Sequence, residues 1–180
     1  MQSGKADIML AVGAESVLCP LVIYSLANAK ALSRRNDSPS TASRPFDVTR
    51  DGFVIGEGGG ALVLETEEHA LARGAKIYAE IRGCGNTDDA YHVTAPHPEG
   101  RGAIACMKQA IAEAGINPSD ISYINAHGTA TNKGDTVETS SIKKVFGNTL
   151  PYVSSTKGAT GHMMGAGGIT ETITLSLIHI

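Results

Sequence analysis

Two histidines follow apolar segments that run into glycine-rich turns, and they are the first candidates for chemistry. In ISYINAHGTAT the apolar segment ends at His127, and in YVSSTKGATGHMMGAGG a second one leads to Lys157 and then His162. Ligand sites in α/β sheets lie beyond the carboxyl ends of strands, so both histidines are expected at the mouth of a site. A neutral imidazole there can donate a hydrogen bond to a developing oxyanion.

His162 is predicted to precede or open the last helix of the chain. The positive end of a helix disfavours an imidazolium, which would keep this ring neutral. The pattern also fits a structural role, because a histidine after a strand is often a cap or a hydrogen-bonded core group. The glycines after His162 could likewise serve close helix–sheet packing alone. Both interpretations stay open on the pattern.

Hydrophobic patterning predicts the elements that must position these residues. Strands are expected at 7–13 (a buried one), 60–65, 76–82, 121–126 and 152–155, and helices at 20–32, 67–73, 102–114, 135–146 and from about 162. Residues 33–45 are polar, contain two prolines and indicate a surface loop. The alternation of strands and helices favours a layered α/β fold with a largely parallel sheet.

Composition excludes several classes of function. A net charge of −3 gives no footprint for nucleic acid or an anionic membrane surface. No apolar run is long enough to span a bilayer, and the first ten residues lack the layout of a signal peptide, as if the chain began within an element. Cys19, Cys84 and Cys106 form no CxxC pair, which favours a reducing compartment and argues against a zinc site. Residues 56–60 (GEGGG) lack the phosphate-loop pattern and are predicted to be a structural turn.

The string NAHGTAT, followed by Asp135 and Glu138, resembles the first histidine motif of the β-ketoacyl synthases. SSTKGATGHMMGAGGITE resembles their lysine and second histidine motif, and RPFDVTRDGFVIGEGGGALVLE and DAYHVTAP are similar to intervening segments of the family. The resemblance runs from about Gln2 to Leu175 and is strongest to the stand-alone elongating synthases of fatty acid synthesis.

This resemblance implies a thiolase-like α/β fold with αβαβα layers, normally in a homodimer. Residues 1–74 would end the N-terminal half, and residues 75–180 would form a truncated C-terminal half. The implied activity is that of a 3-oxoacyl-[acyl-carrier-protein] synthase, an acyltransferase that condenses malonyl carrier protein with an acyl thioester. The substrate would be carried on phosphopantetheine of acyl carrier protein, with no further cofactor and no metal. Bacterial cytoplasm or an organelle matrix would be the location.

The resemblance also implies roles for individual residues. His127 and His162 would stabilise the enolate formed by decarboxylation, and Lys157 would act electrostatically with Glu138, or alternatively Glu171, as its ion partner. The remaining matched positions are Asp135 and Glu171 in the supporting network and Thr94, Thr129 and Thr131 at the pantetheine arm.

The chain departs from the family pattern in three places. The family's nucleophilic cysteine lies upstream of the segment that matches Gln2, and the three cysteines of this chain match no nucleophile position and are expected to be buried fillers. The glycine-rich C-terminal segment that completes the family's pocket is also expected to be missing. Residues Ser176 to Ile180 abandon the pattern and are read as non-native.

Three other interpretations compete with a condensing enzyme. A thiolase shares the fold but would show a Cys-x-Gly motif near its end and no TKGATGH segment. A non-catalytic chain-length subunit of a polyketide synthase would tend to lose His127, Lys157 and His162, which are all present. Alternatively, this chain has no activity of its own, because half of a duplicated fold leaves a sheet edge and an apolar face uncovered.

Overall fold

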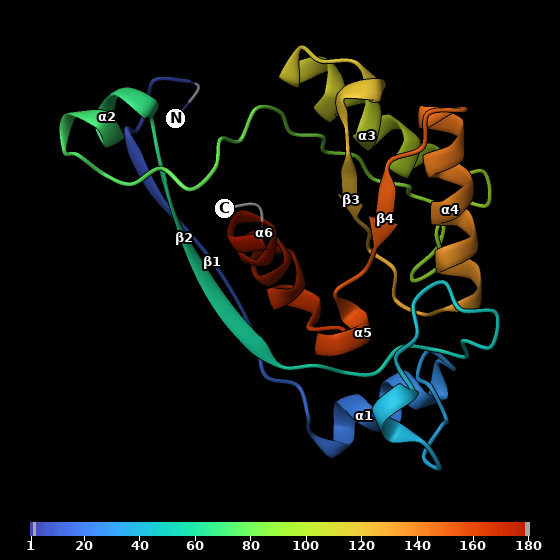
Figure 1. Ribbon diagram of the computed structural model, residues 1–180. Coiled ribbons are helices and arrows are strands. Elements are labelled where there is room, and N and C mark those ends of the chain that lie inside the picture. The colour runs from blue at the N-terminus through green and yellow to red at the C-terminus, as the bar shows by residue number, and fades with distance from the viewer. Residues whose placement is uncertain (2, 179–180) are drawn as a thin grey trace. The chain divides into compact units, whose positions relative to one another are not determined.

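The computed structural model describes residues 1 and 3–178, which form two compact units (Figure 1). Unit 1 comprises the described residues of Met1–Cys19, Ile55–Glu80 and His162–Ile180, and unit 2 comprises Pro20–Val54 and Ile81–Gly161. Gln2 and the last two residues, His179 and Ile180, lie outside the described residues. Gln2 is where the resemblance to the family was predicted to start, and His179 and Ile180 end the tail that was read as non-native, so the structure does not describe these predicted features.

Unit 1 is built on a two-stranded antiparallel sheet. β1 (Ile8–Glu15) pairs with β2 (Gly58–Glu65), with Ile8 opposite Glu65 and Glu15 opposite Gly58. α6 (Gly167–Ile178) packs against both strands, and the short helix α2 (Glu67–Ala72) follows β2 directly. The side chain of Thr66 caps α2 by accepting the N–H of His69, as is typical of a threonine at a helix N-terminus.

Glycines on the sheet allow α6 and the segment before it to approach closely. A Cβ at Gly13 would lie 2.8 Å from Ile169 Cγ2 and 2.9 Å from the carbonyl oxygen of Gly165, and a Cβ at Gly58 would lie 2.8 Å from Met163 Sδ. The prediction of a structural turn at 56–60 is therefore wrong for Gly58 onward. These glycines begin β2, where the missing side chains make room for the residues that precede and open α6.

Unit 2 contains a two-stranded parallel sheet and most of the helices. β3 (Tyr123–Asn125) pairs with β4 (Tyr152–Ser154), and α3 (Arg101–Ala114) lies beside α4 (Asn132–Phe146). The other elements are α1 (Pro20–Asn28), α5 (Lys157–Thr160) and 3-10 turns at Pro39–Thr41 and Pro118–Asp120, with a third such turn, Met164–Ala166, in unit 1.

Most of the predicted elements are present, within a few residues at their ends. α3 ends as expected at Gly115, which takes the left-handed conformation (φ 66°) favoured at helix C-termini. The parallel pairing expected from strand–helix alternation holds for β3 and β4. It fails for β1 and β2, which are antiparallel, and β1 is not buried, since Leu10 and Val12 are each 65% exposed.

Two further predictions are wrong. Residues 76–82 form no strand, although Ile77 and Ile81 alternate with polar residues as a strand would. Those two residues are 47% and 57% exposed, so the described part of the chain does not cover the apolar face that the alternation indicated. The last helix begins at Gly167 rather than near His162, because Gly161 (φ 69°) ends α5 and a 3-10 turn intervenes.

The close approach at Gly13 makes a testable prediction for unit 1. Gly13→Ala should lower the free energy of unfolding by about 1–3 kcal/mol, because the new methyl group meets a backbone carbonyl that cannot move aside cheaply. Gly59→Ala is the matched control, since its Cβ meets the nearest atom at an ordinary 3.4 Å. Urea unfolding of both variants measures the difference. Equal stability of the two variants would contradict the close packing of α6 on β1.

Candidate functional site

His127 stands at the end of β3 in a tightly bonded turn. The parallel ladder continues one residue beyond the strand, because the N–H of Ala126 donates to the Ser154 carbonyl at 2.8 Å. Ala126 and Ala130, on either side of the turn, are 2% and 0% exposed. Gly128 and Ala130 both have positive φ, 36° and 64°, which an alanine adopts only at an energetic cost. The turn is thus held in a conformation that the surrounding contacts must enforce.

Glu138 supplies the strongest of these contacts. From α4 its carboxylate accepts the backbone N–H of His127 at 2.7 Å through one oxygen and that of Gly128 at 2.8 Å through the other. Hydrogen bonds to an ionised carboxylate are shorter and stronger than those between neutral groups. Glu138 therefore fixes the backbone that carries the His127 side chain.

Lys157 opens α5, just after β4, and is 2% exposed. Its N–H donates to the hydroxyl of Ser155 at 3.2 Å, and its carbonyl accepts the hydroxyl of Ser43. The Ser155 hydroxyl in turn donates to the Gly128 carbonyl at 2.9 Å. The backbones that carry His127 and Lys157 are therefore neighbours within unit 2.

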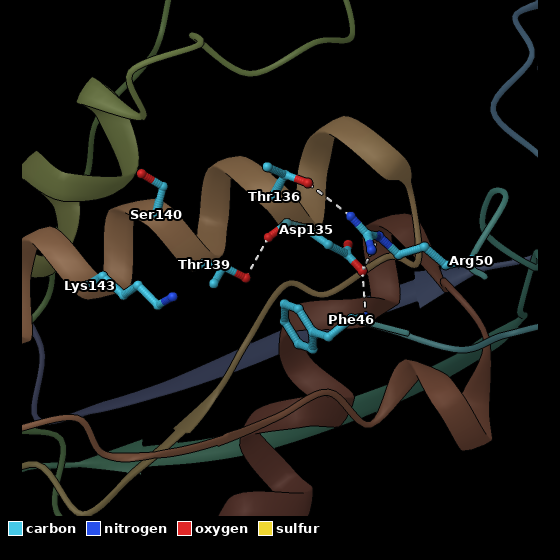
Figure 2. A pocket seen from close by; sticks show the side chains of 7 residues that line it. All are labelled: Phe46, Arg50, Asp135, Thr136, Thr139, Ser140 and Lys143. Atoms are coloured by element: carbon cyan, nitrogen blue, oxygen red, sulfur yellow. Dashed lines mark hydrogen bonds and ion pairs between the residues drawn. The ribbon is translucent and has the colours of Figure 1, made fainter. Parts of the chain in front are cut away.

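Asp135 anchors the segment that precedes β2 against α4 (Figure 2). It is 1% exposed, and one carboxyl oxygen accepts the N–H of Phe46 at 2.7 Å and lies 3.4 Å from Arg50 Nε. Phe46 has a positive φ of 65°, so this bond helps hold a strained residue. In the same loop, the carboxylate of Asp47 accepts hydrogen bonds from the hydroxyl and the N–H of Thr49. These bonds keep the pKa of Asp47 below its ordinary value, because they favour the charged carboxylate.

A pocket of about 440 Å³ opens beside this ion pair. It is lined by Phe46, Arg50, Asp135, Thr136, Thr139, Ser140 and Lys143. Figure 2 shows the side chains of Arg50 and Asp135 pointing toward one another from their two segments. Of the predicted site residues, only Asp135 lines this pocket.

The three predicted pantetheine-binding threonines differ in setting. The hydroxyls of Thr129 and Thr131 lie 2.9 Å apart, and Thr129 is only 7% exposed. Thr94 is exposed in the loop before α3, where its N–H donates to His92 Nδ1 at 3.1 Å.

His162 and Glu171 belong to unit 1, whereas His127 belongs to unit 2. His162 forms a parallel bridge with Ile55, and its Nδ1 accepts the N–H of Met164 at 3.3 Å. This bond places the proton of a neutral ring on Nε2, which can then act as a donor. α6 begins five residues beyond His162, so His162 does not open this helix as one of the two predicted arrangements had it. The meeting of His127 and His162 at one site stays a prediction.

The cysteines are not the buried fillers that were expected. Cys19 and Cys84 are exposed, and Cys106 is half-buried, with its thiol donating to the Gly85 carbonyl. Cys84 lies in a segment without helix or strand, two residues beyond the predicted strand at 76–82. Within residues 1 and 3–178, no group of three or more His, Cys, Asp or Glu side chains could hold a metal ion. No helix in the same residues has the length and apolar character needed to cross a membrane.

Sequence reasoning missed three residues that support the His127 turn. Ser155 lies inside the SSTKG string, and Arg50 and Phe46 lie inside RPFDVTRDGF. The first string was noted for Lys157 and His162 and the second for its resemblance to the family, so neither pointed to these three residues. The only signal in the sequence was the polar and aromatic content of these two strings. The residues that Ser155, Arg50 and Phe46 contact lie about 30 to 90 residues away in sequence, and residue spacing does not identify such pairs.

Comparison with known proteins adds a family match across most of the chain. The family model described as Beta-ketoacyl synthase, C-terminal domain matches residues 78–178, and the corresponding N-terminal domain matches residues 1–70. The chain is 51% identical over 173 residues to 3-oxoacyl-[acyl-carrier-protein] synthase 2 of Rhizobium meliloti, covering 94% of this chain and 41% of the relative. It is 51% identical over 179 residues to the mitochondrial 3-oxoacyl-[acyl-carrier-protein] synthase of Arabidopsis thaliana, covering 96% and 39%.

Solved structures agree with these relatives. One contains a type II polyketide synthase acyl-carrier protein in complex with its ketosynthase bound to the hexaketide (TM-score 0.92, 43% identity, 97% of this chain and 44% of that chain). Another is a β-ketoacyl synthase from Burkholderia phymatum (TM-score 0.90, 42% identity, 97% and 42%). These neighbours have the thiolase fold, which confirms the expected fold class for the part covered. The chain spans about two fifths of the length of the curated relatives it matches.

The carboxylate clamp on the His127 turn is testable by substitution of Glu138. Glu138→Ala should lower the free energy of unfolding by at least about 1.5–3 kcal/mol, because two backbone N–H groups lose a charged acceptor. Glu138→Gln keeps one acceptor oxygen and should recover part of that loss. Chemical denaturation measures both, with the exposed Glu68→Ala as a control for loss of one negative charge. An unchanged stability in Glu138→Ala would refute the clamp.

Proposed function

Because this chain belongs to the β-ketoacyl synthase family, we propose that it forms part of a 3-oxoacyl-[acyl-carrier-protein] synthase of fatty acid synthesis. The reaction is a decarboxylating Claisen condensation, in which malonyl carrier protein reacts with an acyl group held as a thioester. The observation that carries the proposal is the His127 turn, held by Glu138 at the end of β3 beside the buried Lys157. Catalytic groups fixed before substrate binds need no reorganisation during the reaction.

The proposed chemistry divides into two steps at the malonyl group. Breaking the bond to the carboxylate releases CO₂ and leaves an electron pair that becomes an enolate of the thioester. We assign His127 and His162 to the enolate oxygen as hydrogen-bond donors. The enolate carbon then forms a bond to the carbonyl carbon of the acyl thioester, whose thiolate leaves. The hydrogen bond at Nδ1 of His162 suits this role, because it directs the proton of the neutral ring to Nε2.

Lys157 adds an electrostatic contribution in this scheme. A buried ammonium requires a charged or polar partner, because its desolvation is otherwise costly. Glu138 remains the leading candidate for the ion partner and Glu171 the alternative. Asp135 supports the same region through Arg50 and Phe46.

The proposed partner is acyl carrier protein, whose phosphopantetheine arm carries the substrate, with no additional cofactor. Thr94, Thr129 and Thr131 are assigned to that arm. One similar solved structure is described as an acyl-carrier protein in complex with its ketosynthase, which supports the choice of partner. We further propose a homodimer, a boundary between the two synthase halves at residues 74–75, and a bacterial cytoplasmic or organelle-matrix location. The relatives include bacterial, mitochondrial and chloroplastic synthases.

The acyl-accepting thiolate is proposed to be none of Cys19, Cys84 or Cys106. A nucleophilic cysteine needs a setting that lowers the pKa of its thiol, such as a helix N-terminus. Cys106 lies within α3, and Cys84 lies in a segment without helix or strand. Cys19 directly precedes α1 but stands outside the family's strand-to-helix motif for the nucleophile.

A non-catalytic role is the second candidate. One solved neighbour is described as a ketosynthase/chain length factor (TM-score 0.89, 38% identity). Loss of catalytic residues is expected in such a subunit, and the retention of His127, Lys157 and His162 therefore favours the catalytic proposal. A thiolase is less favoured, since the bacterial and mitochondrial relatives that match this chain at 51% identity are synthases.

A chimera tests the proposed function. Residues of the Rhizobium meliloti synthase that align with this chain are replaced by this chain, so that the remaining segments complete the enzyme. The chimera should release CO₂ from malonyl carrier protein. It should then condense the remaining enolate with an acyl group. His127→Ala or His162→Ala should each slow decarboxylation on the order of 10²–10³-fold, as expected for loss of an oxyanion donor.

Cys19→Ser in the same chimera is the control and should decarboxylate normally. A folded chimera that takes up an acyl group yet decarboxylates equally well without either histidine would refute the assignment. A folded chimera with no decarboxylation at all would favour the non-catalytic alternative.

A further inference from the structure

The hydroxyl of Ser155 lies between the two turns that carry His127 and Lys157. A serine hydroxyl has one hydrogen to donate and two lone pairs to accept. Ser155 Oγ donates to the Gly128 carbonyl at 2.9 Å and accepts the N–H of Lys157 at 3.2 Å. One oxygen atom therefore bonds both Gly128, the residue after His127, and Lys157. The two turns are separated by about 30 residues in sequence.

This hydroxyl acts where the backbone ladder stops. β3 and β4 pair in parallel register up to Asn125 and Ser154, and the last ladder bond runs from Ala126 to Ser154. Beyond that point the chains leave the sheet, at His127 on one strand and at Ser155 on the other. The Ser155 side chain continues the connection for one more residue and replaces a backbone bond that the diverging chains cannot make.

The contact at Gly128 leaves little room for adjustment. A Cβ at Gly128 would lie 2.5 Å from Ser155 Cβ and 3.0 Å from Phe46 Cε2, and the residue has a positive φ of 36°. Close packing of this kind transmits a displacement of one group to its neighbours, because protein interiors have few voids to absorb it. A second link parallels the hydroxyl, since the Asn125 side-chain oxygen accepts the N–H of Thr156 at 3.5 Å.

We propose that Ser155 is a positioning residue that couples the His127 turn to the Lys157 turn. It acts by holding the two proposed catalytic residues in a fixed relation, through its bonds to the Gly128 carbonyl and the Lys157 N–H. This inference rests on the proposed function for its kinetic consequence, but its structural consequence is independent of any activity. The Ser155 hydroxyl, rather than the bulk of its side chain, carries the coupling.

The structural test uses amide hydrogen exchange in the full 180-residue chain. Ser155→Ala should speed exchange of the Lys157 N–H by about five- to tenfold, the effect of losing one hydrogen bond of ordinary strength. Ser155→Thr keeps the hydroxyl and should preserve the protection. Ser154→Ala is the matched control, because this adjacent hydroxyl bonds Tyr123 Oη instead. Equal exchange at Lys157 in Ser155→Ala and Ser154→Ala would overturn the proposal.

The kinetic test uses the same three variants in the chimera. Ser155→Ala should lower kcat for decarboxylation about tenfold with KM for malonyl carrier protein within about twofold, since substrate contacts are unchanged. Ser155→Thr should restore kcat, and Ser154→Ala should leave it unaltered. A Ser155→Thr variant as slow as Ser155→Ala would show that packing, not the hydroxyl, matters. An inactive parent chimera would count against the proposed function, while the exchange experiment would still decide the coupling.

Discussion

The carboxylate of Glu138 holds two consecutive backbone N–H groups, at 2.7 and 2.8 Å, and the placement of His127 depends on this interaction. Without it, a turn with positive φ at Gly128 and Ala130 would lack its strongest restraint. Because Glu138 belongs to α4, these bonds also fix the position of the turn after β3 against that helix. The buried Asp135 performs a similar function one turn earlier on α4, where it holds Phe46 and Arg50. Both acidic residues of the first histidine motif thus act on backbone or on a neighbouring cation.

Unit 1 achieves close packing by a different means. Its sheet carries glycines where α6 and the residues before it approach, and side chains of the helix occupy the vacated space. The opposite side of β1 remains exposed, with Ile8, Leu10 and Val12 all at least half exposed. The glycines at the start of β2 therefore have a structural role, which is to make room for α6 and the residues before it, but they form no turn. Glycine here serves close approach rather than an unusual backbone angle.

Much of the fold was predictable because local signals were strong. α3 has an apolar face and a glycine stop, and α2 ends two residues before Gly74, so both were found nearly to the residue. The segment 76–82 shows the limit, since alternation indicates a strand only where a neighbouring strand can pair with it. The direction of β1 relative to β2 was equally unpredictable, because it is set by pairing between residues about 50 positions apart.

The candidate site divides in the same way. His127, Lys157 and His162 were identified by their place after strands, and the structure puts His127 and Lys157 at the ends of β3 and β4. His162 precedes α6 by five residues, with a 3-10 turn between them, and its Nδ1 accepts a backbone N–H that the sequence did not indicate. Ser155 could not be found from the sequence, since its two partners become neighbours only when the parallel strands pair.

We propose that both histidines act on one thioester oxygen. A crystal structure of the chimera with a non-hydrolysable malonyl-pantetheine analogue tests it most directly. We expect a side-chain nitrogen of His127 and Nε2 of His162 both to lie within about 2.6–3.2 Å of the same carbonyl oxygen of the analogue. An analogue bound in the site with only one histidine, or neither, within hydrogen-bond distance of that oxygen would contradict it.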